Sequence, residues 1–255
     1  MPTRQLGKFK VFYKGNWNDK LFNKCMGVVG SRHMTDYGRC VIDKIVPQLI
    51  LDDWTIVSGF MYGVDITAHR ACLDCGGKTI AILGWGINYP VDQPEQALLQ
   101  KIIATGGLIL SLWDNQPGTN WTFPARNRLV AHICHELIVV EAAAKSGALL
   151  TAAMVRNLTK KVWAVPGPIT SPTSAGTNRL IAEGKALPWL GNNFQPQLIN
   201  SPPAHPILKL LSGQTLDAGA IARFLNQPMD QVASQLSLLT LQGAVIEQNG
   251  KYYAS

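Results

Sequence analysis

Six short apolar runs, separated by helical patterns, constrain the fold of this chain more than any other feature. One intervening stretch, residues 41–50, repeats apolar side chains at the spacing of an amphipathic helix. Short apolar strands that alternate with such helices are typical of a parallel sheet with both faces covered. The sequence therefore predicts an α/β fold with a doubly wound parallel sheet. The predicted strands are 27–30, 55–58, 79–83, 108–111, 137–140 and 162–165.

The first two predicted strands end in loops rich in glycine and serine. Gly30-Ser31-Arg32 follows the first strand, and Ser58-Gly59 ends the second shortly before Gly63. Because the carboxyl ends of parallel strands meet at one edge of a sheet, these loops build a crevice there. Small residues let a ligand approach backbone N–H groups, and Arg32 adds a positive charge. The pattern predicts a ligand that carries phosphate.

The last quarter of the chain has a different organisation. Residues 192–206 contain four prolines and no sustained periodicity, which is typical of a linker. Three short helical patterns and a two-stranded ribbon turning at Asn249-Gly250 follow, and this order predicts a winged helix. Its third helix, residues 229–242, contains no Lys or Arg, which favours protein contact or packing over DNA reading. The expected divisions are a basic lead-in segment (1–24), a doubly wound α/β domain (25–191), a linker (192–206) and a winged-helix domain (207–255).

The charge of the chain is concentrated at its start. The formal net charge is +7, and residues 1–24 carry six Lys or Arg against one acid. A basic chain is typical of nucleic-acid binding, because neutralising phosphates releases counterions, although a basic segment is also an ordinary solvated surface. No apolar run is long enough to span a membrane, and the start of the chain lacks the apolar core of a signal peptide. We expect a cytoplasmic protein.

The cysteines do not predict a disulfide framework. Their number, five, is odd, and they lie in apolar or helical stretches. Cys72 and Cys75 can in principle join His132, Cys134 and His135 in a zinc site. Ordinary helical packing accounts for the same residues, and we predict no metal.

A set of motifs in a fixed order runs through nearly the whole chain. They include Tyr13-Lys-Gly15, Val29-Gly-Ser-Arg32, Ser58-Gly59 with Gly63-Val-Asp65, Phe123-Pro-Ala-Arg-Asn-Arg128, Ser146-Gly-Ala-Leu-Leu-Thr-Ala152 and Ala164-Val-Pro-Gly167. By these motifs the chain resembles the DNA-processing protein DprA/Smf family, which implies that residues 25–191 bind DNA. The resemblance implies an extended Rossmann-like domain followed by a winged helix, and a homodimer. It also implies a non-enzymatic protein without a cofactor that binds single-stranded DNA, protects it and hands it to the RecA recombinase during natural transformation.

Two later segments carry residue types that suit single-stranded DNA. Arginine forks grip phosphate oxygens and an aromatic ring stacks on an unpaired base, so the Phe123–Arg128 motif fits this ligand. A core position for Phe123 and ion pairs for the arginines remain alternatives. Lys145-Ser146-Gly147 precedes a helical pattern, whose free N–H groups favour an anion. The candidate DNA contacts are Gly30, Ser31, Arg32, Ser58, Gly59, Phe60, Tyr62, Gly63, Phe123, Arg126, Asn127, Arg128, Lys145, Ser146, Gly147 and Thr151.

The chain departs from the family pattern between Gly59 and Gly63. Relatives commonly carry an arginine there, whereas this chain has Phe60-Met61-Tyr62. One phosphate contact is therefore missing, although the Tyr62 hydroxyl can bond a phosphate and its ring can stack on a base.

Other functions have weaker support in the sequence. A nucleotide-processing enzyme similar to phosphoribohydrolases, or a nucleotide sensor, would use the same crevice. The comparable helix start, Ser146-Gly-Ala-Leu-Leu-Thr151, lacks the carboxylate that such an enzyme needs. Asp65 and His69 have the spacing of a metal or acid–base pair, but a local hydrogen-bonded pair explains them more simply. The motifs of dinucleotide binding and of the P-loop are absent.

Overall fold

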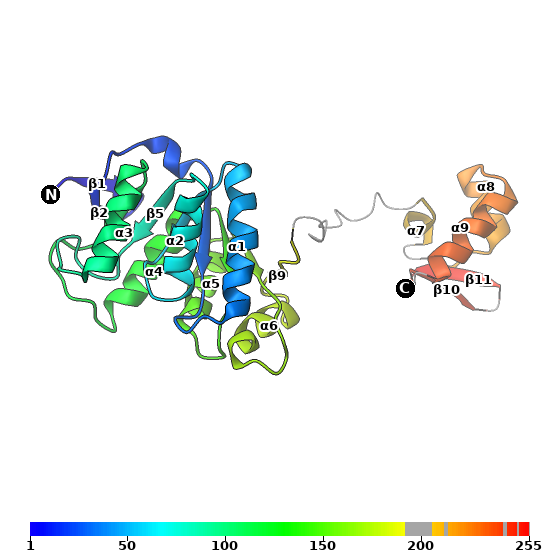
Figure 1. The fold of residues 1–255 in the computed structure, drawn as a ribbon. Coiled ribbons are helices and arrows are strands. Elements are labelled where there is room, and N and C mark those ends of the chain that lie inside the picture. The colour runs from blue at the N-terminus through cyan, green and yellow to red at the C-terminus, as the bar shows by residue number, and fades with distance from the viewer. Residues whose placement is uncertain (192–205, 212–213, 242–243, 249, 255) are drawn as a thin grey trace. The chain divides into compact units, whose positions relative to one another are not determined.

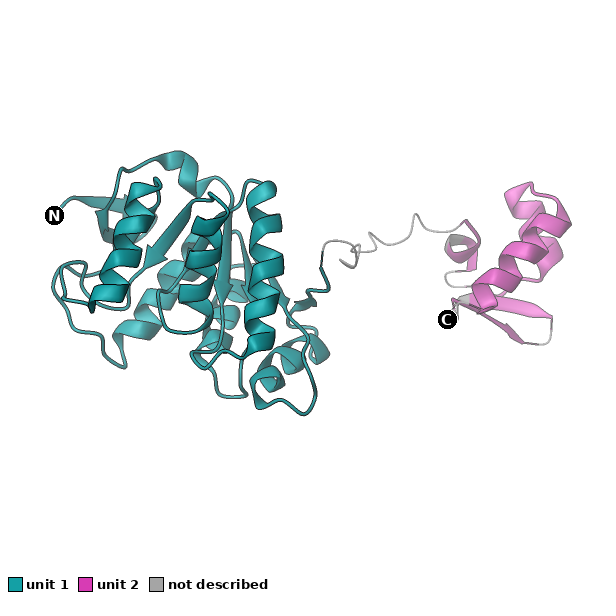
Figure 2. Cartoon of the chain, in the orientation of Figure 1, with its two compact units in different colours: residues 1–196 teal, residues 197–255 magenta. Residues whose placement is uncertain are grey.

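The computed structural model of the protein describes residues 1–191, 206–211, 214–241, 244–248 and 250–254. The chain divides into two compact units, residues 1–196 and 197–255, which Figure 2 shows in teal and magenta. The predicted linker, 192–206, lies almost entirely outside the described residues. Each unit is described by itself below.

Unit 1 contains a nine-stranded sheet in the order β1-β2-β6-β5-β4-β3-β7-β8-β9. Strands β3 to β9 run parallel, whereas β1 and β2 form an antiparallel hairpin whose second strand pairs antiparallel with β6. All six predicted strands are present, to within two residues at either end. The strands are β1 (Thr3–Leu6), β2 (Phe9–Lys14), β3 (Cys25–Val29), β4 (Thr55–Ser58), β5 (Thr79–Ile82), β6 (Leu108–Ser111), β7 (Glu136–Val139), β8 (Lys161–Ala164) and β9 (Leu187–Pro188).

Helices cover both faces of this sheet. Successive side chains of a strand point to opposite faces, and the strands have buried side chains on both of them. Along β7, for example, Leu137 packs toward α4 and α5, and Ile138 packs toward α1 and α2. Figure 1 shows α1, α2 and α3 side by side on the near face. The helices of unit 1 are α1 (Asp36–Leu51), α2 (Val64–Asp74), α3 (Gln93–Ala104), α4 (Thr122–Ile133), α5 (Gly147–Asn157) and α6 (Ala175–Ala182), with short 3-10 turns η1 (Asp19–Phe22) and η2 (Pro172–Ser174).

The start of the chain is part of this sheet rather than a separate lead-in. Hairpin β1–β2 extends the sheet beyond β6, and Val11 is fully buried in the same core as Leu129. Lys10 and Lys14, two of the lysines that suggested a solvated segment, lie in β2 beside the fully buried Val11 and three partly buried aromatic residues, so this strand is half-buried. The predicted domain start at residue 25 is therefore too late.

Unit 2 has three helices and a two-stranded antiparallel sheet in the described ranges. Its core is formed by Ile207, Leu211, Ile221, Leu236 and Val245, among others. The helices are α7 (Pro206–Leu211), α8 (Ala218–Leu225) and α9 (Met229–Leu241), and the strands are β10 (Val245–Gln248) and β11 (Lys251–Ala254). Of the predicted turn, Asn249 lies outside the described residues. No described helix is long and apolar enough to cross a membrane.

Candidate nucleic-acid interface

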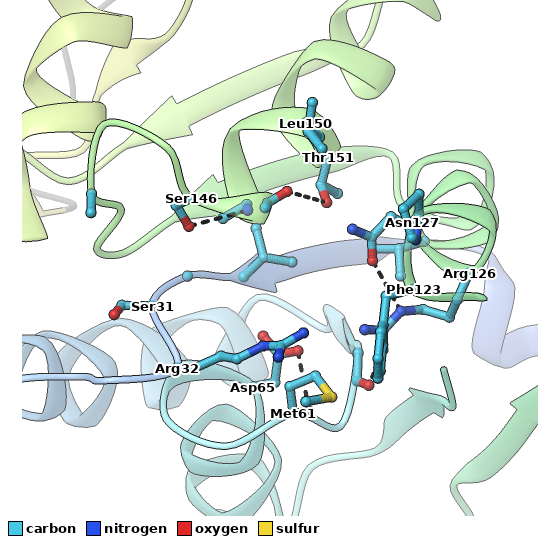
Figure 3. A pocket seen from close by; sticks show the side chains of 18 of the residues that line it. Ser31, Arg32, Met61, Asp65, Phe123, Arg126, Asn127, Ser146, Leu150 and Thr151 are labelled. Atoms are coloured by element: carbon cyan, nitrogen blue, oxygen red, sulfur yellow. Dashed lines mark hydrogen bonds between the residues drawn. The ribbon is translucent and has the colours of Figure 1, made fainter. Parts of the chain in front are cut away.

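A cleft of about 500 Å³ opens where the chain reverses its direction of travel across the sheet. From β3 the chain adds β4, β5 and β6 on one side, and then returns to add β7 on the other side. The loops after β3 and β7 therefore diverge, and ligands of open α/β sheets bind at such a point. Figure 3 shows Arg32, Asp65 and Met61 on one side of this cleft, and Ser146, Leu150 and Thr151 on the other.

The loop after β3 presents Arg32 to solvent at the cleft. Its guanidinium lies 5.0 Å from the centre of the Phe123 ring, within the range of a cation–π contact. Across the described residues it has no ion pair and no side-chain hydrogen bond. Gly63, at φ 75°, makes this geometry possible, because a Cβ there would lie 2.3 Å from the Ser31 carbonyl oxygen. Arg32 thus keeps its hydrogen-bond donors for a ligand.

The opposite wall is the amino end of α5. Ser146 is the N-cap, and its side chain accepts a hydrogen bond from the backbone N–H of Ala148 at 3.3 Å. Gly147 lines the cleft, and Lys145 beside it is exposed. Free N–H groups, the positive end of the helix dipole and a lysine together favour a bound anion. Thr151, one turn into the helix, is buried and donates to the Gly147 carbonyl.

Arg126 lies beneath the cleft rather than in its opening. Only 3% of its surface is exposed, and its Nη1 donates to the carbonyls of Gly59 and Ile82, the second at 2.6 Å. Its Nε donates to Asn127 Oδ1 at 3.0 Å. Burial lowers the pKa of Arg126 to about 10, against the opposing effect of Asp65. Arg126 therefore holds together the ends of β4 and β5 while remaining charged at neutral pH.

Asp65 is the acid among the described residues that line the cleft, and it is buried. It accepts a hydrogen bond from the Met61 N–H at 3.3 Å. Burial raises the pKa of this carboxyl, and Arg126 is the largest influence in the other direction. The exposed cations Arg32 and Lys145, one on each wall, therefore make the opening of the cleft positive.

The Phe123 ring is half-buried and packs closely against two glycines. A Cβ on Gly84 would lie 2.5 Å from a ring carbon, and one on Gly118 would lie 3.2 Å from another. The ring also lines the cleft. Phe123 is thus both a packed aromatic and a part of the cleft wall, which combines the two alternatives left open by the sequence.

Five predicted contact residues do not line this cleft. Ser58 is fully buried, and its hydroxyl donates to the Val28 carbonyl at 2.5 Å. Phe60 is 1% exposed, because its φ of 58° turns the side chain into the core. Neither side chain reaches the cleft, which corrects the sequence-based assignment. Arg128 is exposed but does not line the cleft. Tyr62 lines two neighbouring hollows, and Gly63 lines one of them.

Asp65 and His69 do not form the predicted pair. Asp65 bonds to the loop that precedes its helix, whereas His69 Nδ1 bonds to Thr79 Oγ1 at 2.7 Å. Three residues of the zinc alternative, Cys72, Cys134 and His135, form hydrogen bonds with other groups. His135 Nδ1 accepts from the Cys25 N–H, and the described residues contain no cluster of three potential metal ligands.

Sequence reasoning missed His33, Met61, Asn120 and Leu150, which also line the cleft. His33 directly follows Arg32, and Asn120 lies just before α4, so their proximity to the motifs was visible. Nothing in the sequence indicated that Leu150 lines the cleft, because a leucine in a helical pattern is expected on the buried apolar face of the helix.

Comparison with known proteins agrees with this geometry. Residues 7–195 match the family model of DNA recombination-mediator protein A. The chain belongs to this family. The chain is 40% identical over 169 residues to the putative DNA processing protein DprA of Mycobacterium tuberculosis. The aligned residues cover 66% of this chain and 43% of that protein.

Two solved structures of the DprA family share the fold. The X-ray structure of DNA processing protein A from Streptococcus pneumoniae has a TM-score of 0.66 and 36% identity, over 72% of this chain and 64% of that one. DNA processing protein A from Helicobacter pylori, a protein with a single-stranded DNA binding mode, has a TM-score of 0.65 and 28% identity, over 75% of this chain and 87% of that one. The chain spans about half the length of the mycobacterial relative.

Proposed function

We propose that the cleft binds single-stranded DNA and that the protein acts as a recombination mediator. The observation that carries this proposal is the pairing of two walls: Arg32 on one side, and the α5 amino end with Lys145 on the other. Arginine forks and helix amino ends are both suited to phosphate oxygens. Membership of the recombination-mediator family supports this choice of ligand.

The proposed contacts divide by chemistry. Phosphate oxygens lie against Arg32, Lys145 and the N–H groups around Gly147, which fix the strand without reading its sequence. The Phe123 ring and the amide of Asn127 face the same cleft and offer a stacking surface and hydrogen bonds to an unpaired base. Backbone near Gly30, Ser31 and Gly59 allows the strand to approach closely. Ser146 and Thr151 hold the helix end in place.

Replacing Arg32 by alanine is expected to weaken binding of labelled oligo-dT by about ten- to a hundredfold, because a charge-assisted contact contributes about 1.5–3 kcal/mol. The free energy of unfolding should change by less than about 0.5 kcal/mol, since the side chain is exposed. Fluorescence anisotropy at several salt concentrations measures the first quantity, and thermal unfolding measures the second. The control is Lys78→Ala, which changes an exposed lysine just before β5, at the end of the sheet away from the cleft. Equal affinity of Arg32→Ala and the control would refute the proposed site.

The finer parts of the proposal concern partners and the second unit. We propose that the protein hands its bound strand to RecA during natural transformation, that it acts in the cytoplasm, and that it does so as a homodimer. We also propose that residues 207–255 are a winged-helix domain and that residues 192–206 are a linker. Because its third helix carries no Lys or Arg, protein contact suits this domain better than DNA reading.

A nucleotide-processing activity is the competing function, and the cleft favours it less. Phosphoribohydrolase chemistry needs a carboxylate near the anion-binding helix, yet α5 starts without one and Asp65 is buried beneath the loop. Incubation with nucleoside monophosphates, followed by chromatography for the free base, tests this alternative. Release of free base at a rate proportional to protein concentration would favour the enzyme.

A further inference from the structure

A second groove, of about 480 Å³, lies beside the cleft and shares two residues with it. Arg32 and His33 line both hollows, so the loop after β3 is the ridge between them. The other walls come from the first turn of α1, from α2 and from the start of α3. These helices contribute Arg39, Thr67, Arg70 and Glu95, and the loop before α2 contributes Tyr62 and Gly63.

The groove is strongly positive. Arg32, Arg39 and Arg70 are all exposed, and within the described ranges none of them has an ion pair or a side-chain hydrogen bond. The acid that lines the groove is Glu95, and its negative charge is the main cause that raises the pKa of the neighbouring Tyr62 phenol. Three arginines that have neither an ion pair nor a side-chain hydrogen bond among the described residues, against one acid, form a site for a ligand with several negative charges.

The fold itself brings these arginines together. Arg39 lies in the first turn of α1 and Arg70 lies in the second turn of α2, and the two helices pack against each other. Gly63 allows the loop before α2 to pass against the carbonyls of Ser31 and Arg32. A side chain there would separate the two walls, because its Cβ would lie 2.7 Å from the Arg32 oxygen.

We propose that this groove binds the backbone of single-stranded DNA that continues past Arg32, so that one strand occupies both hollows. The inference rests on the proposed function of the cleft. A strand carries phosphates at regular intervals, and basic grooves with aromatic walls track such a backbone. Tyr62, which is 59% exposed, provides the aromatic wall. The shared Arg32 favours a continuous strand over an acidic peptide, which has no reason to extend into the cleft.

The test compares oligonucleotides that differ in length. Labelled oligo-dT of about 4 nucleotides fills the cleft alone, whereas one of about 16 nucleotides can reach the groove as well. In the double variant Arg39→Gln/Arg70→Gln, we expect affinity for the short strand to stay within about twofold and affinity for the long strand to fall at least about tenfold. The slope of log K against log salt should become shallower by about 1.4 for the long strand, since two phosphate contacts are lost.

The charge-matched control is Lys78→Ala/Arg156→Ala, which removes two exposed cations. Lys78 lies just before β5 and Arg156 lies in the last turn of α5, so both are at the amino ends of the strands, away from the cleft. If the wild-type protein binds neither strand, the proposed function itself fails. If it binds both, and the glutamine variant matches the control on the long strand, DNA does not enter the groove and the inference is wrong. Equal losses on both strands would also overturn it. Loss of poly-glutamate binding without loss of DNA binding would assign the groove to an acidic protein segment.

Discussion

Replacing Arg126 by methionine is expected to destabilise unit 1 by about 3–5 kcal/mol, the cost of removing one partner from a buried charged network. The guanidinium donates to the carbonyls of Gly59 and Ile82, and its loss leaves both without that donor. It also leaves the buried Asp65 carboxyl without the neighbouring positive charge that opposes its desolvation. The destabilised loops after β4 and β5 carry Gly59 and Gly84, and Gly84 packs against the Phe123 ring of the cleft wall, so binding of oligo-dT should weaken as well.

Tryptophan fluorescence during urea unfolding measures this effect in unit 1 alone, because all seven tryptophans precede residue 190. Arg128→Met is the matched control, since it removes an exposed arginine two residues further along α4 and should change stability by less than about 0.5 kcal/mol. The Asp65→Asn variant, alone and combined with Arg126→Met, completes a double-mutant cycle. A combined loss clearly smaller than the sum would establish the coupling. Equal stability of the two arginine variants would contradict it.

The contrast between Arg126 and Arg128 could have been read from the sequence. Once residues 122–133 are taken as a helix, Arg126 lies three and four positions before Leu129 and Val130, which are core residues. Arg128 lies about 200° around the helix from Arg126 and faces solvent. The motif identified both arginines as functional, but helical periodicity separates the one that supports the cleft from the one that is exposed.

Other positions depended on information that the sequence does not carry locally. The apolar runs predicted strands β4 and β6 at their observed bounds, because short buried parallel strands leave a continuous apolar signal. Phe60 lies between Gly59 and Gly63, and the sequence predicts it as a DNA contact. Its positive φ instead turns the ring inward. Arg39 and Arg70 are distant in sequence, and only the packing of α1 against α2 brings them to one groove.

Stability is expected to fall as the pH drops below about 6.5, with His69 as the largest single histidine contribution. The ring is fully buried, and burial, aided by Arg126, lowers its pKa from 6.5 to about 3. Thr79 Oγ1 donates its proton to the Ile56 carbonyl, so His69 Nδ1 carries a proton and donates it to Thr79 Oγ1. The other ring nitrogen, Nε2, has no hydrogen-bond partner among the described residues. A second proton would have to be placed on Nε2, in the core beside the Phe60 ring. The folded protein therefore resists protonation of this histidine.

The sign of the effect follows from proton binding. Between pH 6.5 and about 3 the unfolded chain holds a proton on His69 that the folded chain does not. This contribution is fully present above pH 6.5 and decreases by about 1.4 kcal/mol per pH unit as the pH falls, until the folded pKa is reached. In urea unfolding followed by tryptophan fluorescence, His69→Asn should be less stable at pH 7, because it loses packing against Phe60. Its Nδ2 can still donate to Thr79, but it does not titrate, so its stability should fall less steeply between pH 6.5 and 4. Parallel pH profiles for the two proteins would mean that His69 is protonated equally in the folded and unfolded states, and that the acid sensitivity of unit 1 comes from its other titratable groups.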